Sequence, residues 1–190
     1  MSLFEFTFAL SAVILGLALT QIASDVHKLL LAGRRVTWAA EPVLLTLIVL
    51  LVIVAVWLGQ WFDRAEASVS VGWILLTVVK LLILYIAAAS CLPEVDNDQA
   101  PVDMFAYYDR TRRLSFGALI VSYALFEVAD VINGDLPARI TLWVLTEWLL
   151  YPVLYLSLII VRARWFNILA LLFGLLFYAN FMLRVRLDGG

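Results

Sequence analysis

The chain has 190 residues, of which 65% are hydrophobic, and its formal net charge is −2. A soluble domain is typically about 45–50% apolar, so this composition excludes an ordinary globular core and predicts an integral membrane protein. A single cysteine and a single histidine exclude an intramolecular disulfide, a CxxC redox pair and metal centres that need two imidazoles, and the absence of a basic run argues against nucleic-acid binding.

Six apolar stretches follow one another along the chain, and each has about the 20 residues that a helix needs to cross a bilayer. We therefore predict an all-α membrane protein with six transmembrane helices in one bundle, forming a single domain over residues 1–190. The first stretch lacks the basic leading segment of a cleaved signal, so we interpret it as a retained helix. The expected helices are 4–31, 38–61, 68–92, 114–132, 138–161 and 165–183.

Prolines mark three of these helices. Pro42 falls in the first turn of helix 38–61, where a missing N–H costs nothing, and Pro93 ends helix 68–92. Pro152 lies inside helix 138–161, where it removes one backbone hydrogen bond and favours a kink.

The segment 102–113, between the third and fourth helices, has an amphipathic pattern. Apolar and aromatic side chains share one side of it, while Asp109, Arg112 and Arg113 share another. This pattern predicts a short helix that lies in the headgroup plane of the membrane. The alternative is that the segment forms the beginning of the fourth helix.

Basic residues near the helix ends are distributed unevenly, with eight on one side of the predicted membrane and four on the other. The larger set is Lys28, Arg34, Arg35, Arg110, Arg112, Arg113, Arg162 and Arg164, and the smaller set is Arg64, Arg139, Arg184 and Arg186. Cytoplasmic loops carry an excess of Lys and Arg. We therefore expect the side with the larger set to be cytoplasmic and both termini to lie outside.

Three ionisable side chains, Lys80, Glu127 and Glu147, lie deep within the apolar stretches, and Asn180 falls at a similar predicted depth. A charge at the bilayer centre costs about 2.5–3.5 kcal/mol on insertion scales, so such residues face one another or a wet cavity. One lysine against two glutamates leaves an excess carboxylate that is either protonated or neutralised by a cation. These four residues are the predicted ion- or substrate-binding site.

The site predicts a channel or secondary transporter for a proton, a cation or a small polar solute. Asp130, one turn beyond Glu127, is a candidate to pair with Arg139 and gate an outer vestibule; the alternative for that pair is a plain surface contact. The alternative for the buried charges is an ion pair that fixes helix register. The protein would then be a non-transporting assembly component or a lipid- or quinone-binding subunit.

No nucleophile elbow, P-loop or dinucleotide-binding glycine pattern occurs in the sequence, so an enzyme is not the expectation. The expected partners are the lipid bilayer and a proton or monovalent cation, and a homo-oligomer is compatible with the sequence. We identify no catalytic residue, no cofactor and no protein metal ligand.

Several segments are similar to known sequences: 15–20 in the first helix, Cys91-Leu92-Pro93-Glu94 at the end of the third, and 102–108 leading to Phe116-Gly117. Together they resemble a group of small six-helix bacterial inner-membrane proteins that has no assigned activity. The resemblance implies a bacterial, helical, polytopic protein, and it implies no cofactor or site residue.

Overall fold

The computed structural model of the chain describes residues 3–62, 71–95, 101–133 and 142–184. These residues form six α-helices, which confirms the predicted all-α class. The helices are α1 (Leu3–Ala32), α2 (Ala40–Phe62), α3 (Val71–Ala89), α4 (Met104–Asn133), α5 (Leu142–Ile160) and α6 (Arg164–Arg184). A short 3-10 helix, η1 (Gly33–Arg35), and two strands of two residues, β1 (Val36–Thr37) and β2 (Val102–Asp103), complete the described elements.

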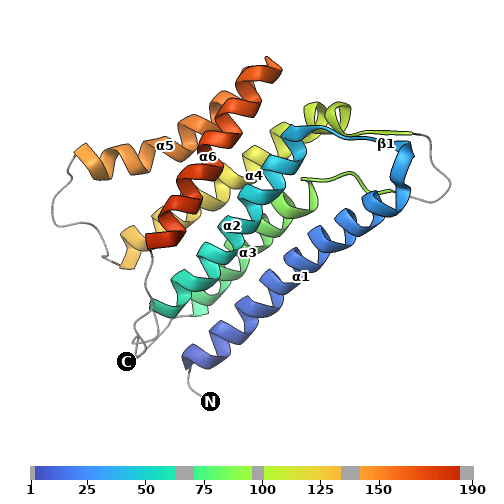
Figure 1. The fold of residues 1–190 in the computed structure, drawn as a ribbon. Helices are drawn as coiled ribbons and strands as arrows, with labels where there is room; N and C mark the ends of the chain where they lie inside the picture. Colours follow the sequence, from blue (N-terminus) through green and yellow to red (C-terminus); the bar gives the residue numbers. More distant parts are fainter. Residues whose placement is uncertain (1–2, 63–70, 96–100, 134–141, 185–190) are drawn as a thin grey trace.

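The helices lie side by side, with α1 at one edge and with α2, α3 and α4 between it and the α5–α6 pair (Figure 1). The most extensive contacts join α3 to α4, α1 to α3, α2 to α6 and α4 to α5. The buried core therefore runs along the middle helices. It includes Leu45, Ile48, Leu84, Phe116 and Leu171, each at most 1% exposed.

Three helices are long and apolar enough to cross a membrane, judged by length and composition: Glu5–Arg35, Ala40–Gln60 and Val71–Ala89. Two shorter apolar helical segments, Trp148–Ile160 and Arg164–Asn180, follow. Large apolar side chains remain exposed along all of these segments. Exposed apolar surface of this extent often marks an interaction site with a membrane or another protein.

Local sequence explains where several elements begin and end. Gly33 has a φ of 55°, which a glycine adopts at no steric cost, and it turns the chain out of α1. Asp103 caps α4, since its Oδ1 accepts hydrogen bonds from the N–H groups of Phe105 at 2.9 Å and Ala106 at 3.0 Å. Strand β1 pairs in parallel with β2, with Val36 opposite Val102, so the two connections that enter α2 and α4 lie together.

The prediction of a separate amphipathic helix over 102–113 is wrong. Residues 104–133 form one continuous helix, because neither proline nor glycine interrupts the backbone ladder between Met104 and Phe116. Arg112 was expected at the headgroup surface, but it is 2% exposed and points into the bundle. The alternative interpretation, in which this segment begins the fourth helix, is therefore the one that the structure supports.

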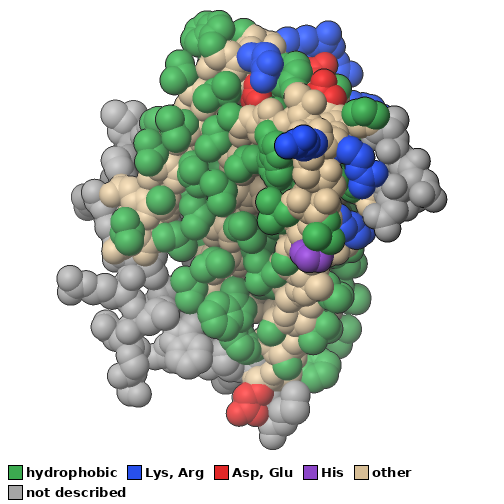
Figure 2. Space-filling model, turned by 45° about the vertical axis from the view of Figure 1, so that its right-hand side comes forward, with side chains coloured by type: hydrophobic (Ala, Val, Ile, Leu, Met, Phe, Trp, Pro, Cys, Tyr) green, Lys and Arg blue, Asp and Glu red, His purple; other side chains and the backbone are tan. Residues whose placement is uncertain are grey.

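The other helix boundaries fall close to those expected from the sequence, and residues 68–70 and 138–141 lie outside the described ranges. Charged side chains are concentrated at one end of the molecule. Figure 2 shows hydrophobic side chains over the helical flank, with Lys and Arg side chains gathered toward that end. We call it the basic end; it comprises residues 21–41, 90–95, 101–114 and 160–167.

Candidate functional site

Lys80 is the tenth of the nineteen residues of α3, and it is 4% exposed. Its Nζ lies 4.8 Å from the centroid of the Trp73 ring and 4.4 Å from that of Phe126 on α4. Aromatic faces attract an ammonium group electrostatically, and most strongly where water is excluded. These two rings therefore provide a favourable environment for a cation at the middle of an otherwise apolar helix.

The neighbouring turn of α4 carries the second predicted charge. Glu127 follows Phe126 directly in the sequence and is half-buried. Ser122, one turn earlier on α4, donates a hydrogen bond from its hydroxyl to the Lys80 carbonyl oxygen at 3.4 Å. Neither Lys80 nor Glu127 is without an interaction partner. The structure thus brings Lys80 against the part of α4 that contains Glu127.

The structure describes the side chains of only some of the remaining predicted site residues. Glu147 belongs to α5, which packs on α4, but its side chain lies outside the described part of the structure. The same holds for the side chain of Asp130 on α4, and Arg139 falls within the undescribed segment 134–141. Asn180 is exposed on α6. The convergence of all four predicted site residues therefore stays a prediction.

A second polar group, which the sequence analysis did not identify, lies at the basic end. Glu41, in the first turn of α2, is fully buried. Arg164, the first residue of α6, donates from Nε to its Oε1 at 2.9 Å and from Nη2 to its Oε2 at 3.5 Å. The guanidinium also stacks over Phe105 of α4 at 4.0 Å. The ion pair thus connects the beginnings of α2 and α6, and the ring contact adds the beginning of α4.

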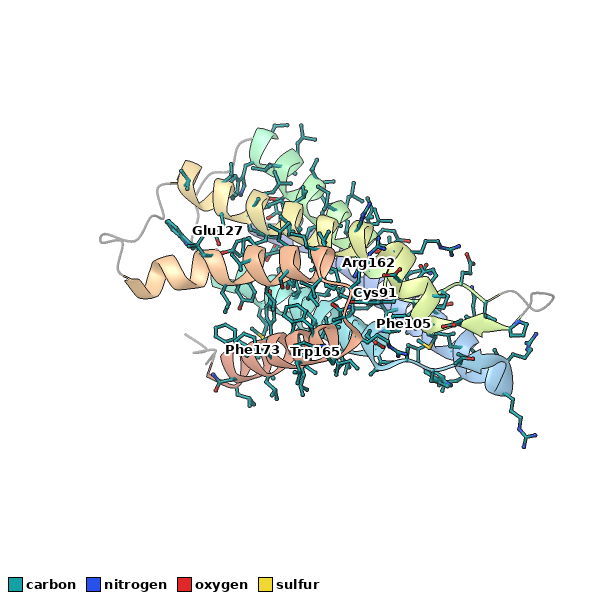
Figure 3. All side chains as sticks on the ribbon, turned by 90° about the horizontal axis from the view of Figure 1, so that it is seen from above. Cys91, Phe105, Glu127, Arg162, Trp165 and Phe173 are labelled. Carbon is teal, nitrogen blue, oxygen red and sulfur yellow. The ribbon has the colours of Figure 1, made fainter. Side chains whose placement is uncertain are left out.

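Arg112 makes a second connection at the basic end. Its Nη1 donates to the Val161 carbonyl at 3.1 Å, just beyond the last residue of α5, and its Nε lies 3.4 Å from Asp109 Oδ1. The last carbonyls of a helix have no partner within the helix, so a buried arginine there satisfies an orphaned acceptor. Figure 3 shows Arg162, Cys91 and Phe105 in this region, well separated from Glu127.

Asp25 on α1 is a third buried charge at the basic end, with 2% of its surface exposed. The Gln21 amide donates to its two carboxylate oxygens at 3.0 and 3.1 Å. Beside it, Lys28 forms an ion pair with Glu94 at 3.3 Å, which ties α1 to the segment after α3. The described acidic side chains of this end are therefore mostly bonded to amide or cationic partners.

Two buried polar atoms of the described residues have no partner in the protein: the Tyr108 hydroxyl and Asn167 Oδ1. Burial raises the pKa of the Tyr108 phenol, and the charge of Glu41 raises it further while Arg112 opposes the rise. Buried polar groups are almost always bonded to protein or to ordered water. These two atoms are therefore the positions at the basic end where bound water is expected.

Aromatic rings fill the interior from the basic end into the bundle. Tyr108 meets the edge of Phe116, which stacks on Tyr155 of α5 with ring centroids 5.9 Å apart. Tyr151 continues the row, with its ring centroid 4.7 Å from that of Tyr178 on α6 and 5.6 Å from that of Tyr123 on α4. This packing joins α4, α5 and α6 through large apolar surfaces rather than through charges.

Cys91, the single cysteine, gives a direct test of the packing at the end of α3. It is 1% exposed, its thiol donates to the Ala87 carbonyl at 3.1 Å, and burial raises its pKa. Because the thiolate is the reactive form, we expect maleimide to label Cys91 at least about tenfold more slowly in the folded protein than in SDS. In a Cys91→Ala background, His27→Cys places a thiol at an exposed position and should react quickly in both conditions. Equal rates for Cys91 in both conditions would contradict its burial.

Glu41 and Arg164 were missed because each stands at the edge of an apolar stretch, where a charge looks like an ordinary solvated end group. A signal was nevertheless present: Pro42 favours the first turn of a helix, and Glu41 directly precedes it. Among the described residues, no group of three or more His, Cys, Asp or Glu side chains is arranged to hold a metal ion.

Comparison with known proteins finds no family model, no curated protein and no solved structure that matches the chain.

Proposed function

We propose that this chain is a six-span protein of the bacterial inner membrane, with the basic end in the cytoplasm and both termini outside. Three helices of sufficient length and hydrophobicity support the membrane placement. Two tryptophans at the basic end, Trp38 and Trp165, are 50% and 68% exposed, which is typical of residues that lie at the headgroup level. The excess of Lys and Arg near that end supports its cytoplasmic position.

Within this frame, we propose that the protein is a channel or secondary transporter for a proton, a cation or a small polar solute. The observation that supports this most is the burial of Lys80 at the centre of α3, against two aromatic rings. An ionisable residue deep within a membrane helix is costly and is generally kept for ion or substrate pathways.

The proposed roles follow from the charges. Lys80 is the fixed cation, held by Trp73 and Phe126. Glu127 or Glu147 is the group that exchanges a proton or a monovalent cation, because only one of two carboxylates is neutralised by one lysine. Pro152 lies within α5, where its missing N–H weakens the backbone ladder near Glu147 and lets the helix bend during transport.

A second candidate function is a non-transporting component, such as an assembly partner or a lipid- or quinone-binding subunit. The aromatic row between α4, α5 and α6 favours it, because rings such as Tyr151, Tyr155 and Phe116 fill this interior and carry no charge that would neutralise a moving ion. In that case Lys80 fixes helix register and carries no flux.

The decisive experiment is a flux assay in proteoliposomes that contain an internal pH dye, under imposed proton gradients and then K⁺ or Na⁺ gradients. We expect flux in the wild type and its loss, by at least about tenfold, in Lys80→Met, Glu127→Gln and Glu147→Gln. Lys28→Met is the matched control, since this lysine lies in a surface pair with Glu94 outside the proposed site, and it should retain flux.

Circular dichroism and size-exclusion chromatography of each variant separate loss of transport from loss of folding. Wild-type protein that is folded and reconstituted but carries no tested ion would overturn the transport proposal and leave the non-transporting alternative. Flux that persists in all three cluster variants would instead exclude these residues from the pathway.

A further inference from the structure

Two arginines at the basic end, Arg113 and Arg162, are exposed. Among the described residues, neither takes part in an ion pair. By contrast, the arginines beside them in the bundle are committed to partners: Arg112 to Asp109 and Arg164 to Glu41. Within the described part of the chain, Arg113 and Arg162 are therefore cations without an ion-pair partner.

The fold brings the two arginines to the same part of the rim. Arg112 Nη1 bonds the Val161 carbonyl at 3.1 Å, and this contact holds the first third of α4 beside the connection between α5 and α6. Arg113 directly follows Arg112 in the sequence, and Arg162 directly follows Val161. Two long, flexible guanidinium side chains thus start from neighbouring backbone segments, one in α4 and the other in the connection between α5 and α6.

Exposed apolar side chains adjoin both arginines. Leu114, next to Arg113, is 55% exposed, and Ile160, two residues before Arg162, is 67% exposed. Trp165, three residues after Arg162, is 68% exposed. A change from exposed Leu and Ile to Arg, with a Trp at the same level, is the pattern expected where hydrocarbon gives way to phospholipid headgroups.

We propose that Arg113 and Arg162 bind the phosphate of an anionic phospholipid in the leaflet at the basic end. A planar guanidinium donates two parallel hydrogen bonds to a phosphate, and two of them suit a negatively charged headgroup better than a zwitterionic one. The adjoining apolar side chains contact the acyl chains, so the ligand is a lipid rather than free phosphate. This inference rests on the proposed membrane placement but not on transport.

The test is native mass spectrometry of the full chain, released from detergent micelles that contain equal amounts of phosphatidylglycerol and phosphatidylcholine. We expect the wild type to retain phosphatidylglycerol at least about fivefold more than phosphatidylcholine. The Arg113→Gln/Arg162→Gln variant should lose this preference. Arg34→Gln, which removes an exposed arginine of η1, should keep it.

Three outcomes would overturn the site: no preference in the wild type, a preference that survives in the double variant, or complete competition by millimolar inorganic phosphate, which would indicate a free anion. Extraction with alkaline carbonate tests the membrane placement separately. Protein released by carbonate would refute the six-span proposal, whereas carbonate-resistant protein without a lipid preference would refute only the lipid site.

Discussion

Replacing Arg164 with methionine is expected to destabilise the protein much more than replacing its partner Glu41 with glutamine. Arg164→Met leaves a carboxylate without its cation at a position that is fully buried, where an uncompensated charge is expensive. Glu41→Gln leaves the charge on a guanidinium that is 56% exposed and can turn to water, and the glutamine oxygen still accepts from Arg164 Nε. The two substitutions therefore differ in cost, because only Arg164→Met leaves an unpaired charge that is buried.

Thermal unfolding in one detergent, followed by circular dichroism, measures this asymmetry. We expect Arg164→Met to lower the apparent Tm by about 5 °C or more and Glu41→Gln to lower it by less than half as much. The double variant, which has no charge left at this pair, should melt closer to the wild type than Arg164→Met does. Equal effects of the two single substitutions would show that the burial of Glu41 does not govern the stability of this pair.

The helical architecture could be predicted because its main signal is one-dimensional. Long apolar runs identify α1, α2 and α3, and Gly33 and Pro93 mark where two of them end, since each changes the backbone locally. The contacts between the connections were not predictable in this way. The pairing of Val36 with Val102 joins two-residue strands that are far apart in the sequence and too short to leave an alternating pattern.

The largest error in the fold concerned α4, and its cause is physical. A surface helix and a partly buried helix show the same spacing of polar residues when one of those residues is a buried arginine. Arg112 and Arg113 are adjacent and chemically identical, yet the first is 2% exposed and the second lies on the surface. Adjacent residues of a helix point in different directions. Which of the two faces the bundle and reaches the Val161 carbonyl depends on how α4 packs against the end of α5.

The candidate site likewise has one feature that the sequence predicts and others that depend on how the helices pack. The burial of Lys80 could be anticipated, because a lone lysine in the middle of an apolar helix has no route to water. Trp73, two turns away, shares a face of the same helix with Lys80, but the contact with Phe126 of α4 could not be anticipated, because it depends on how two helices pack. Counting depth along each helix also grouped Asn180 with the charges, but depth says nothing about rotation, and Asn180 faces outward on α6.

Truncating Arg112 to alanine should cost far more stability than truncating its neighbour Arg113. Arg112 is the largest fully buried side chain among those described, so Arg112→Ala leaves a cavity and removes the donor from the Val161 carbonyl. Large-to-small changes in a core cost about 2–5 kcal/mol. Arg113→Ala removes an exposed side chain and should change the free energy of unfolding by no more than about 0.5 kcal/mol.

Unfolding by urea titration in a zwitterionic detergent provides the measurement, because no anionic amphiphile is then present to interact with Arg113. Arg112→Met separates the two contributions at this position: it fills most of the space but donates no hydrogen bond. If packing dominates, Arg112→Met recovers most of the stability lost in Arg112→Ala, and if the bond to Val161 dominates, the two variants are equally unstable. A wild-type stability for Arg112→Ala would mean that α4 is not anchored to the α5–α6 connection, and the juxtaposition of Arg113 with Arg162 would lose its basis as well.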